Sequence, residues 1–530
     1  MPRRPLLVFL FTVLSIFGLA ADSIRAELDA KEKQLEQLYA EYWRTEYRIA
    51  QGEKDVSSLD VQKRIREVVA DDPFLARLKA ARFGDRTLRR RQQIFEEEAI
   101  ATKISTHPEL AKLVEDIGRD EGDMRYRVGD KQLARSELRN LLAHSPDREV
   151  RREAWNAMAQ LTAKTGEPIR KAMKMRIALA EKHAGRPFAD FMLQRKGIES
   201  RARLMQWFEE IGRETDGAYR DLLNQIKTKL KVEKVEPWDL SYYFSTLTGD
   251  FEDKAFVPEQ AWAKILKAAA PLGFDFQHPP VDVKITEITF GGGTYPILYR
   301  REVKILINKY KGLRFVDTLF HESGHGLHYS FDNDPSFLLQ ANYAEPFDEG
   351  LGQVMALLLY RPEVAGEIFG LTPQQVQAIN QRYRLQSLYD LRETIADSMF
   401  EFEAYANPDQ DLNKLYNGIY SKYLGVEIPE SAPSVWAFDP FYASGPIYLQ
   451  SYVLAEMVGR QIHHALDQKF GKRWGKPAGS YMREKFFSRG GMLTLDEIMK
   501  EGTGEPLTAK YLIEALKEPA RNLQMSPASQ

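Results

Sequence analysis

Two histidines and two glutamates in the middle of the chain have the types and spacing that suit a bound metal ion. The chain contains His321-Glu322-x-x-His325, and Glu349 follows the second histidine by 24 positions. Residues four apart lie on one face of an α-helix, about one turn from each other, so the two imidazoles can point at one ion. Neutral imidazole suits zinc, and a catalytic zinc keeps three protein ligands plus an open position for water. We therefore expect one Zn²⁺ per chain, with Glu349 as the candidate third ligand.

The alternative is a helix in which this pattern arose by chance. With 9 histidines in 530 residues, His-Glu-x-x-His should occur by accident in about one such chain in a hundred. Leu319, Phe320 and Leu327 can pack the other side of the motif into a core, and Gly324 permits a neighbour to approach closely. Because Glu349 also opens another helix-like run, these features favour metal binding over coincidence.

Glu322 is expected to be the acid–base group of this site. Zinc lowers the pKa of a bound water towards about 7, which makes a hydroxide nucleophile available at neutral pH. Glu322 can take the proton as water attacks a peptide carbonyl and hand it to the leaving nitrogen, while the metal stabilises the oxyanion. We do not expect Glu322 to be a ligand, because it leaves the helix in a different direction from the two histidines.

Two tyrosines are candidates for a second donor to the oxyanion. Tyr448 and Tyr452 are four apart in a predicted helix that follows a glycine-containing stretch. Both phenols could therefore face one cleft. The alternative is that both are half-buried packing residues.

Three further residues are expected to surround the ligands. Asp317, one turn before His321, could orient that imidazole, and Gln353, one turn after Glu349, could do the same for its helix. His328 lies at i+7 from His321 and so on a similar face. Since two histidines and one glutamate already complete the ligand set, we expect His328 either to support a ligand or to lie in the core.

The composition is that of a globular protein. The chain has 530 residues, 43% of them hydrophobic and 28% charged, and a formal net charge of -2. There is no basic excess to neutralise phosphates, so we expect no nucleic-acid partner. The absence of cysteine excludes disulfides, thiolate metal sites and a lipid-modified amino-terminal cysteine.

The first 20 residues have the pattern of a signal peptide for export. Arg3 and Arg4 precede the apolar residues 6–20, and Gly18-Leu19-Ala20 fits a small-x-small cleavage site. The apolar run is short for a membrane span. We expect a periplasmic or extracellular protein with no stable membrane insertion after cleavage. An uncleaved amino-terminal anchor is the alternative.

Residues 21–530 are expected to form a single, mainly α-helical body, because no repeat or low-complexity linker divides them. Predicted helices include residues 27–50, a run that begins near residue 148 after a Ser-Pro-Asp start signal, residues 350–360, residues 371–405, and a run from Tyr452 past His463. The basic cluster at residues 89–91 is interpreted as a solvated helix face without function.

Extended chain is expected only at residues 281–307. Residues 281–289 alternate in hydrophobicity with period two, residues 291–293 are three glycines, and residues 295–299 and 303–307 can be partner strands. A small sheet therefore precedes the metal helix directly. The edge of such a sheet could hold an extended peptide by strand addition.

Three stretches give the chain a family resemblance. They are residues 317–328 around the two histidines, the Glu-Pro-Trp-Asp-Leu-Ser-Tyr-Tyr run at 236–243, and the Lys-His-Ala-Gly-Arg-Pro-Phe-Ala-Asp-Phe run at 182–191. Together they resemble the oligoendopeptidase F and thimet oligopeptidase family of zinc peptidases. The Phe-Asp-Glu-Gly run at 347–350 and its interval from the histidines are also similar to the angiotensin-converting enzyme family. The resemblance covers about residues 30–515.

The resemblance implies a helical ellipsoid split by a deep channel with zinc on its floor, which admits short unstructured peptides and excludes folded proteins. It places the catalytic part at about residues 200–515 and implies His321, His325 and Glu349 as ligands with Glu322 as the base. Tyr452 is the better match to the family's transition-state tyrosine, and Tyr448 is the second choice. Both families carry a histidine in the stretch ahead of that tyrosine, whereas residues 438–442 here have none.

The leading hypothesis is an exported zinc metallopeptidase that acts on short oligopeptides. One alternative keeps the metal but cleaves another bond, as in an amidase that acts on cell-wall or other small amides. A second alternative is a non-catalytic peptide-binding protein, although a binding protein would not need the acid Glu322. The oligomeric state, and whether dipeptides are removed or bonds are cut internally, stay open.

Overall fold

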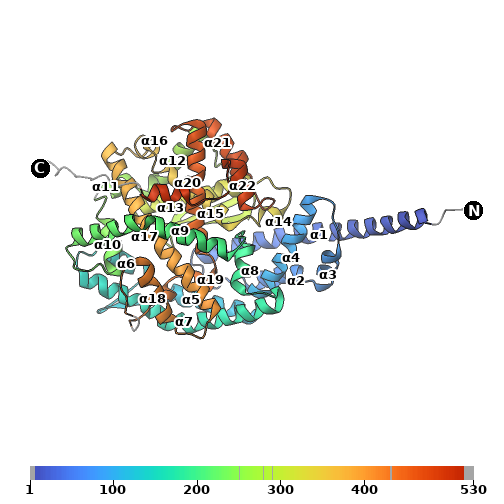
Figure 1. The fold of residues 1–530 in the computed structure, drawn as a ribbon, viewed down its shortest axis with the longest axis horizontal. Coiled ribbons are helices and arrows are strands. Elements are labelled where there is room, and N and C mark those ends of the chain that lie inside the picture. The colour runs from blue at the N-terminus through green and yellow to red at the C-terminus, as the bar shows by residue number, and fades with distance from the viewer. Residues whose placement is uncertain (1–5, 250, 279, 289, 430–431, 518–530) are drawn as a thin grey trace, which may run out of the picture.

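The first helix, α1 (Leu6–Ala50), extends beyond the rest of the protein at one end (Figure 1). In this computed structural model the described residues are 6–249, 251–278, 280–288, 290–429 and 432–517, with side chains from residue 22. Leu28, Leu35 and Leu38 recur at helical spacing and are buried. They pack with α2 (Leu59–Val69), α3 (Asp72–Ala80) and α4 (Arg86–Ser105) in a separate core, to which Leu338 and Leu339 of α14 (Phe337–Gln340) also belong. The helix predicted for residues 27–50 is confirmed as the second half of α1.

The basic cluster at residues 89–91 is a solvated helix face only at Arg89, which is exposed; for Arg90, which is half-buried, and for Arg91, which is buried, that interpretation was wrong. Arg91 is only 8% exposed, and its Nε donates to Glu32 Oε2 at 2.9 Å. Arg90 Nε donates to the carbonyl of Gly491 at 2.7 Å. The reason is that α1 supplies the acidic side chains of Glu32 and Asp29 to this interface, so Arg91 pairs there and does not face solvent.

Most of the remaining elements share a second, larger core of buried apolar side chains. The helices before the sheet are α5 (Pro108–Asp123), α6 (Arg135–His144), α7 (Arg148–Ala184), α8 (Phe188–Arg195), α9 (Arg201–Leu230), α10 (Pro237–Ser245), α11 (Phe251–Ala255) and α12 (Pro258–Ala269). After the sheet come α13 (Leu313–Phe331), α14 (Phe337–Gln340), α15 (Glu345–Leu358), α16 (Pro362–Ala365), α17 (Pro373–Ala406), α18 (Leu412–Leu424), α19 (Phe441–Ser444), α20 (Gln450–Phe470), α21 (Lys476–Met482), α22 (Leu495–Thr503) and α23 (Lys510–Lys517). The mainly α class is therefore confirmed.

Several helix ends follow directly from the sequence. Asp147 caps α7 by accepting a hydrogen bond from the Glu149 amide, and Gly185 ends it with a positive φ of 65°. Thr372 and Gln375 form a reciprocal capping box at the start of α17. None of the described helices combines the length and apolar character that crossing a membrane requires.

The three predicted strands are present beside α13. β3 (Val281–Thr286), β4 (Gly292–Leu298) and β5 (Glu302–Asn308) form a sheet in the order β3-β5-β4, with β3 parallel and β4 antiparallel to β5. Within the described residues β4 is therefore an edge strand. The short hairpin of β1 (Tyr126–Val128) and β2 (Lys131–Leu133) was not predicted, so the expectation of extended chain only at residues 281–307 was wrong.

The helices α13, α15 and α20 lie close to this sheet in the upper part of Figure 1, while α5, α7 and α18 occupy the lower part. α15 packs against both α13 and α20. This arrangement brings the two ends of the predicted metal site, 24 residues apart in sequence, onto adjacent helices.

Candidate active site

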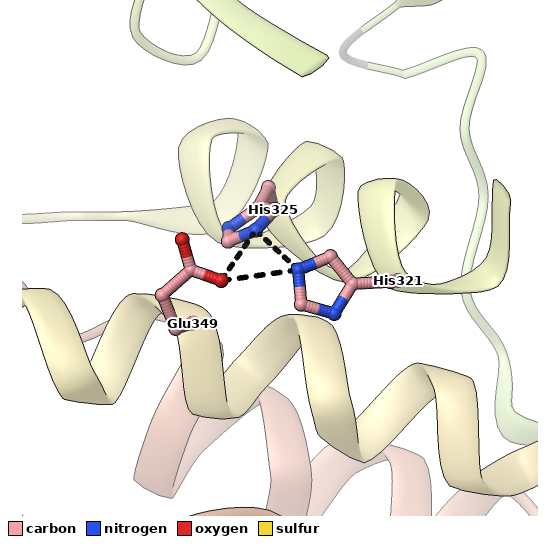
Figure 2. Close-up of side chains that lie close together, drawn as sticks. All are labelled: His321, His325 and Glu349. Atoms are coloured by element: carbon pink, nitrogen blue, oxygen red, sulfur yellow. Dashed lines mark hydrogen bonds and ion pairs between the residues drawn. The ribbon is translucent and has the colours of Figure 1, made fainter. Parts of the chain in front are cut away.

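Two helices bring the three predicted metal ligands together. His321 and His325 come from α13 and Glu349 from α15, and their side chains converge in Figure 2. The two Nε2 atoms are 3.1 Å apart, and Glu349 Oε2 lies 3.2 Å from His321 Nε2 and 3.8 Å from His325 Nε2. Ligand atoms bound at about 2.0–2.1 Å to a tetrahedral zinc lie about 3.3 Å from one another. The donor set and its spacing therefore fit such an ion.

Glycines allow the two ligand-bearing helices to approach backbone to backbone. A Cβ atom on Gly324 of α13 would lie 2.3 Å from the carbonyl oxygen of Leu351 on α15. In the other direction, a Cβ atom on Gly352 would lie 2.6 Å from Cε1 of His321. Since real Cβ contacts are essentially never so short, any side chain at either position would separate the helices or displace the imidazole.

Asp348 holds His325 from behind and was not predicted as a site residue. Its Oδ2 lies 3.1 Å from His325 Nδ1 and accepts a hydrogen bond from Tyr329 Oη at 2.7 Å. This contact turns the opposite ring nitrogen, Nε2, towards Glu349. The only hint in the sequence was that Asp348 adjoins the candidate ligand.

His328 belongs to the same buried network. This agrees with one of the two positions predicted for it, in which it supports a ligand. Its Nδ1 is 2.6 Å from Asp348 Oδ1, and its Nε2 is 2.8 Å from the carbonyl oxygen of Arg489. Both acceptors need a proton on the facing nitrogen, so the ring is held as an imidazolium. Burial opposes that charge, but the hydrogen bond and charge of Asp348 raise the pKa of His328.

The electrostatics of the ligand cluster favour a positive charge. Burial acts to lower the pKa of His325, but Asp348, Glu349 and Glu322 outweigh it and raise the pKa to about 10. Burial acts to raise the pKa of Asp348, and the two neighbouring histidines lower it overall. A metal ion and protons compete for the same nitrogens, so these carboxylates favour a cation of either kind.

Glu322, the predicted base, is fixed by the sheet. The Oγ1 atom of Thr294 in β4 donates to Glu322 Oε2 at 2.7 Å and also contacts the Glu322 carbonyl oxygen at 3.1 Å. Glu322 is buried, at 7% exposure. The sheet predicted next to the metal helix thus contacts the predicted base directly. The alternation of hydrophobic residues predicts the strands but does not reveal this contact.

The two predicted tyrosines have different surroundings. Tyr448 donates a short hydrogen bond to Glu349 Oε1, whereas Tyr452 lines a cavity beside His321. Their ring centres are 5.5 Å apart. Tyr448 precedes α20, which begins at Gln450, so the prediction that both lie in one helix was wrong. The chain turns at Ile447, whose φ is +55°, and the Ile447 amide donates to Glu401 Oε1 at 2.8 Å.

Asp317 and Gln353 do not have the predicted orienting contacts within the part of the chain that the structure describes. Asp317 accepts a hydrogen bond from Tyr360 Oη at 2.9 Å, and burial raises its pKa to about 6. Gln353 Nε2 donates to Glu456 Oε1 at 2.8 Å. Both residues therefore stabilise the wall of the site and leave the orientation of the ligands to Asp348 and Tyr448.

A cavity of about 210 Å³ opens beside His321. Its walls come from α13, α15, α17 and α20, and they carry several charged and phenolic side chains, among them Arg314, Arg382, Asp390, Tyr452 and Glu456. The deep channel that the resemblance implies stays a prediction.

Comparisons with known proteins agree with this geometry. The model of peptidase family M3 matches residues 141–260 and 301–518, more than half of the chain. An oligoendopeptidase F homolog of Mycoplasma pneumoniae is 25% identical over an alignment of 282 residues, and the match covers 46% of this chain and 44% of that protein. The chain thus matches less than half the length of that relative.

Among solved structures, an M32 carboxypeptidase from Deinococcus radiodurans R1 has a similar fold. The TM-score is 0.64 at 15% sequence identity, over 93% of this chain and 98% of that chain. At this identity the likeness concerns the fold alone. From the family match across both the helices that precede the sheet and those that carry the ligands, we conclude that the chain belongs to peptidase family M3.

Proposed function

We propose that this protein is a zinc metallopeptidase that hydrolyses peptide bonds in short oligopeptides. The observation that carries the proposal is the convergence of His321, His325 and Glu349 next to Glu322, at the side of a cavity. When bound, Zn²⁺ supplies Lewis acidity, which polarises a carbonyl and makes water more acidic. Membership of peptidase family M3 supports a peptide as the substrate.

Glu322 is the group that moves the proton. Its carboxylate takes a proton from the attacking water and delivers it to the leaving nitrogen of the cleaved bond. Thr294 Oγ1 holds one carboxylate oxygen at 2.7 Å, which fixes the direction in which the other oxygen faces. Burial excludes bulk water from this carboxylate, so the proton stays with the reacting groups.

Tyr448 and Tyr452 have different proposed roles. Tyr448 orients Glu349 through its hydrogen bond to Oε1. Tyr452 lines the cavity beside His321, and its phenol donates to the oxyanion that develops on the substrate carbonyl. β4 is an edge strand that carries Thr294, so an extended peptide bound along that edge would have its backbone next to Glu322.

The decisive comparison is between the wild type and Glu322→Gln. Both proteins should contain about one zinc per chain, but the variant should lose about 10²- to 10⁴-fold in turnover of a peptide mixture followed by mass spectrometry. Glu167→Gln is a matched control, because 80% of that side chain is exposed on α7. Unchanged turnover in Glu322→Gln, or turnover that survives complete chelation, would refute the mechanism.

The same experiment separates the alternatives. An amidase for other small amides would contain zinc but leave every peptide intact. A non-catalytic binding protein would retain peptides without cleaving them. Glu322 argues against the second, since a site that only binds has no use for a buried base held by Thr294.

Export is proposed on the sequence pattern of residues 1–20. The cleavage position after Ala20 falls inside α1 (Leu6–Ala50). Amino-terminal sequencing of the protein recovered from the periplasm or medium should begin at Ala21. Recovery of the intact chain in the membrane fraction would instead support the uncleaved anchor.

A further inference from the structure

A buried lysine at the end of α8 lies beside Tyr448, the residue that contacts the proposed ligand Glu349. Lys196 is only 7% exposed. Its Nζ atom lies 4.5 Å from the centre of the Tyr448 ring and also forms a short ion pair with Glu345. Lysine is almost never buried unless it is paired, because removing its charge from water is costly. The contacts of Lys196 therefore indicate a specific role at this position.

Glu345 connects Lys196 to the starts of two helices of the site. It is the first residue of α15, one turn before Glu349. Its Oε2 pairs with Lys196, and its Oε1 accepts a hydrogen bond from Ser451 Oγ of α20 at 2.7 Å. Burial acts to raise the pKa of Glu345, and Lys196 and Ser451 oppose that rise. The lysine thus helps to keep the charge on the carboxylate that joins α15 to α20.

The backbone next to Lys196 packs directly against the start of α15. The Glu345 amide donates to the carbonyl oxygen of Lys196 at 3.1 Å. The following residue, Gly197, has a φ of +80°, and a Cβ atom there would lie 2.5 Å from the Cβ atom of Ala344. A side chain at position 197 would therefore push this turn away from α15. The site of the ammonium group is set by these close contacts as well as by its ion pair.

The ammonium group of Lys196 acts on the hydroxyl of Tyr448 through the ring. A cation over an aromatic face is attracted to the ring electrons, and more strongly where water is excluded. The same charge stabilises the negative charge that shifts onto the phenol oxygen when the hydroxyl donates a hydrogen bond. Tyr448 donates its short hydrogen bond to Glu349 Oε1. Phe441 also stacks on the Tyr448 ring, with ring centres 4.9 Å apart, so the ring is held in one orientation.

We propose that Lys196 is a positioning residue, whose ammonium group holds Tyr448 and strengthens the hydrogen bond that orients Glu349 towards the metal. The inference rests on the proposed function and adds to it a residue from outside the helices that carry the ligands and the tyrosines. It follows that zinc affinity depends on Lys196, and that this dependence requires the hydroxyl of Tyr448.

The test is a double-mutant cycle of zinc affinity, measured by competition with a chromophoric chelator. It compares the wild type, Lys196→Met, Tyr448→Phe and the double variant. Tyr448→Phe keeps the ring beside the ammonium group and removes only the hydroxyl. Lys196→Met should lower zinc affinity about five- to thirtyfold, the range for a desolvated cation on an aromatic face. In the Tyr448→Phe background the same substitution should change zinc affinity by less than about twofold.

A lysine with a merely structural role would give a different result, because Lys196→Met would then lower zinc affinity equally with and without the hydroxyl. Denaturant unfolding of the metal-free proteins measures the structural part separately. Since Lys196→Met leaves Glu345 buried without its cation, the cycle is repeated with Glu345→Gln in all four proteins, which removes the unpaired charge. Lys234→Met is the matched control, because Lys234 also pairs with a glutamate but its side chain is 51% exposed. That control should bind zinc as the wild type does.

The outcomes separate this inference from the proposed function. Equal losses of zinc affinity in the two backgrounds, or an unchanged zinc affinity in Lys196→Met, would overturn the role of Lys196 while peptide cleavage stands. A wild type that binds zinc but cleaves no peptide would refute the proposed function, and the cycle would still decide the role of Lys196. A wild type that binds no zinc would refute both.

Discussion

Replacing Gly352 with alanine tests whether the contact between α13 and α15 sets the position of a metal ligand. The new Cβ atom would lie 2.6 Å from His321 Cε1 and 2.8 Å from both ring nitrogens, whereas ordinary contacts begin at 3.4 Å. The ring must therefore move by about 0.8 Å or the helices must separate. Functional sites tolerate errors of about 0.5 Å. We expect zinc affinity to fall by about 10- to 100-fold, as for lost orienting contacts around metal ligands.

The effect on folding should be smaller than the effect on zinc. Overpacking in a core costs about 1–3 kcal/mol, and alanine regains about 1 kcal/mol over glycine inside a helix. The metal-free variant should thus unfold at a free energy about 0–2 kcal/mol below that of the wild type. Gly217→Ala on α9 is the matched control, since a Cβ atom there meets nothing within 4 Å. That control should be neutral or slightly stabilised, with unchanged zinc affinity.

Zinc affinity is measured by competition with a chromophoric chelator, and stability by denaturant unfolding of the metal-free proteins. For Gly352→Ala we expect a large loss of zinc affinity and a small loss of folding stability. Zinc affinity within about threefold of the wild type would refute it, because His321 would then tolerate a shift that the packing forbids. Equal losses of zinc affinity in Gly352→Ala and Gly217→Ala would point to a general effect of alanine in a helix.

Three further substitutions test other contacts. Asp348→Asn should weaken zinc binding about 10- to 100-fold in the same chelator competition, because His325 loses its anionic partner; undiminished affinity would contradict that role. Thr294→Val should lower kcat about five- to tenfold with zinc content unchanged, and an unaltered kcat would show that Glu322 needs no help from β4. Burial raises the pKa of Glu401 to about 8 from an ordinary 4.5. Between pH 4.5 and pH 8 the folded protein therefore keeps the proton on Glu401, whereas the unfolded chain loses it. The stability that this proton contributes is complete below pH 4.5 and is lost as the pH rises through 8. Glu401→Gln should remove that decline, on the order of a few kcal/mol, in unfolding measured at pH 6 and 9; parallel profiles for both proteins would exclude the effect.

Local signals in the sequence predicted much of the fold. The capping residues Asp147 and Thr372 and the terminating Gly185 mark helix ends through contacts a few residues away, which a sequence displays directly. The strands β3, β4 and β5 were predicted from their alternation and the glycines between them. Their order was not, because placing β5 in the centre depends on pairing between distant segments.

The site was predictable where its chemistry resides in spacing along one helix. His321 and His325 needed only the helical repeat, whereas Asp348 and Thr294 act through contacts made by other elements. The arginine at position 91 shows the same limit. Its charge predicted that the side chain is exposed to solvent. Instead, α1 supplies Glu32 to a buried interface that no local pattern reveals.

The close contact of α13 with α15 separates reactivity from selectivity. The proposed metal ligands and the proposed base lie on two helices locked together at glycines, while much of the cavity wall comes from α17 and α20. Evolution, or a protein engineer, could therefore reshape the wall at positions such as Leu391 or Thr394 and change which peptides are accepted. The proposed reacting centre would keep its geometry throughout, so changes in the wall would alter which peptides are accepted without moving the proposed catalytic groups.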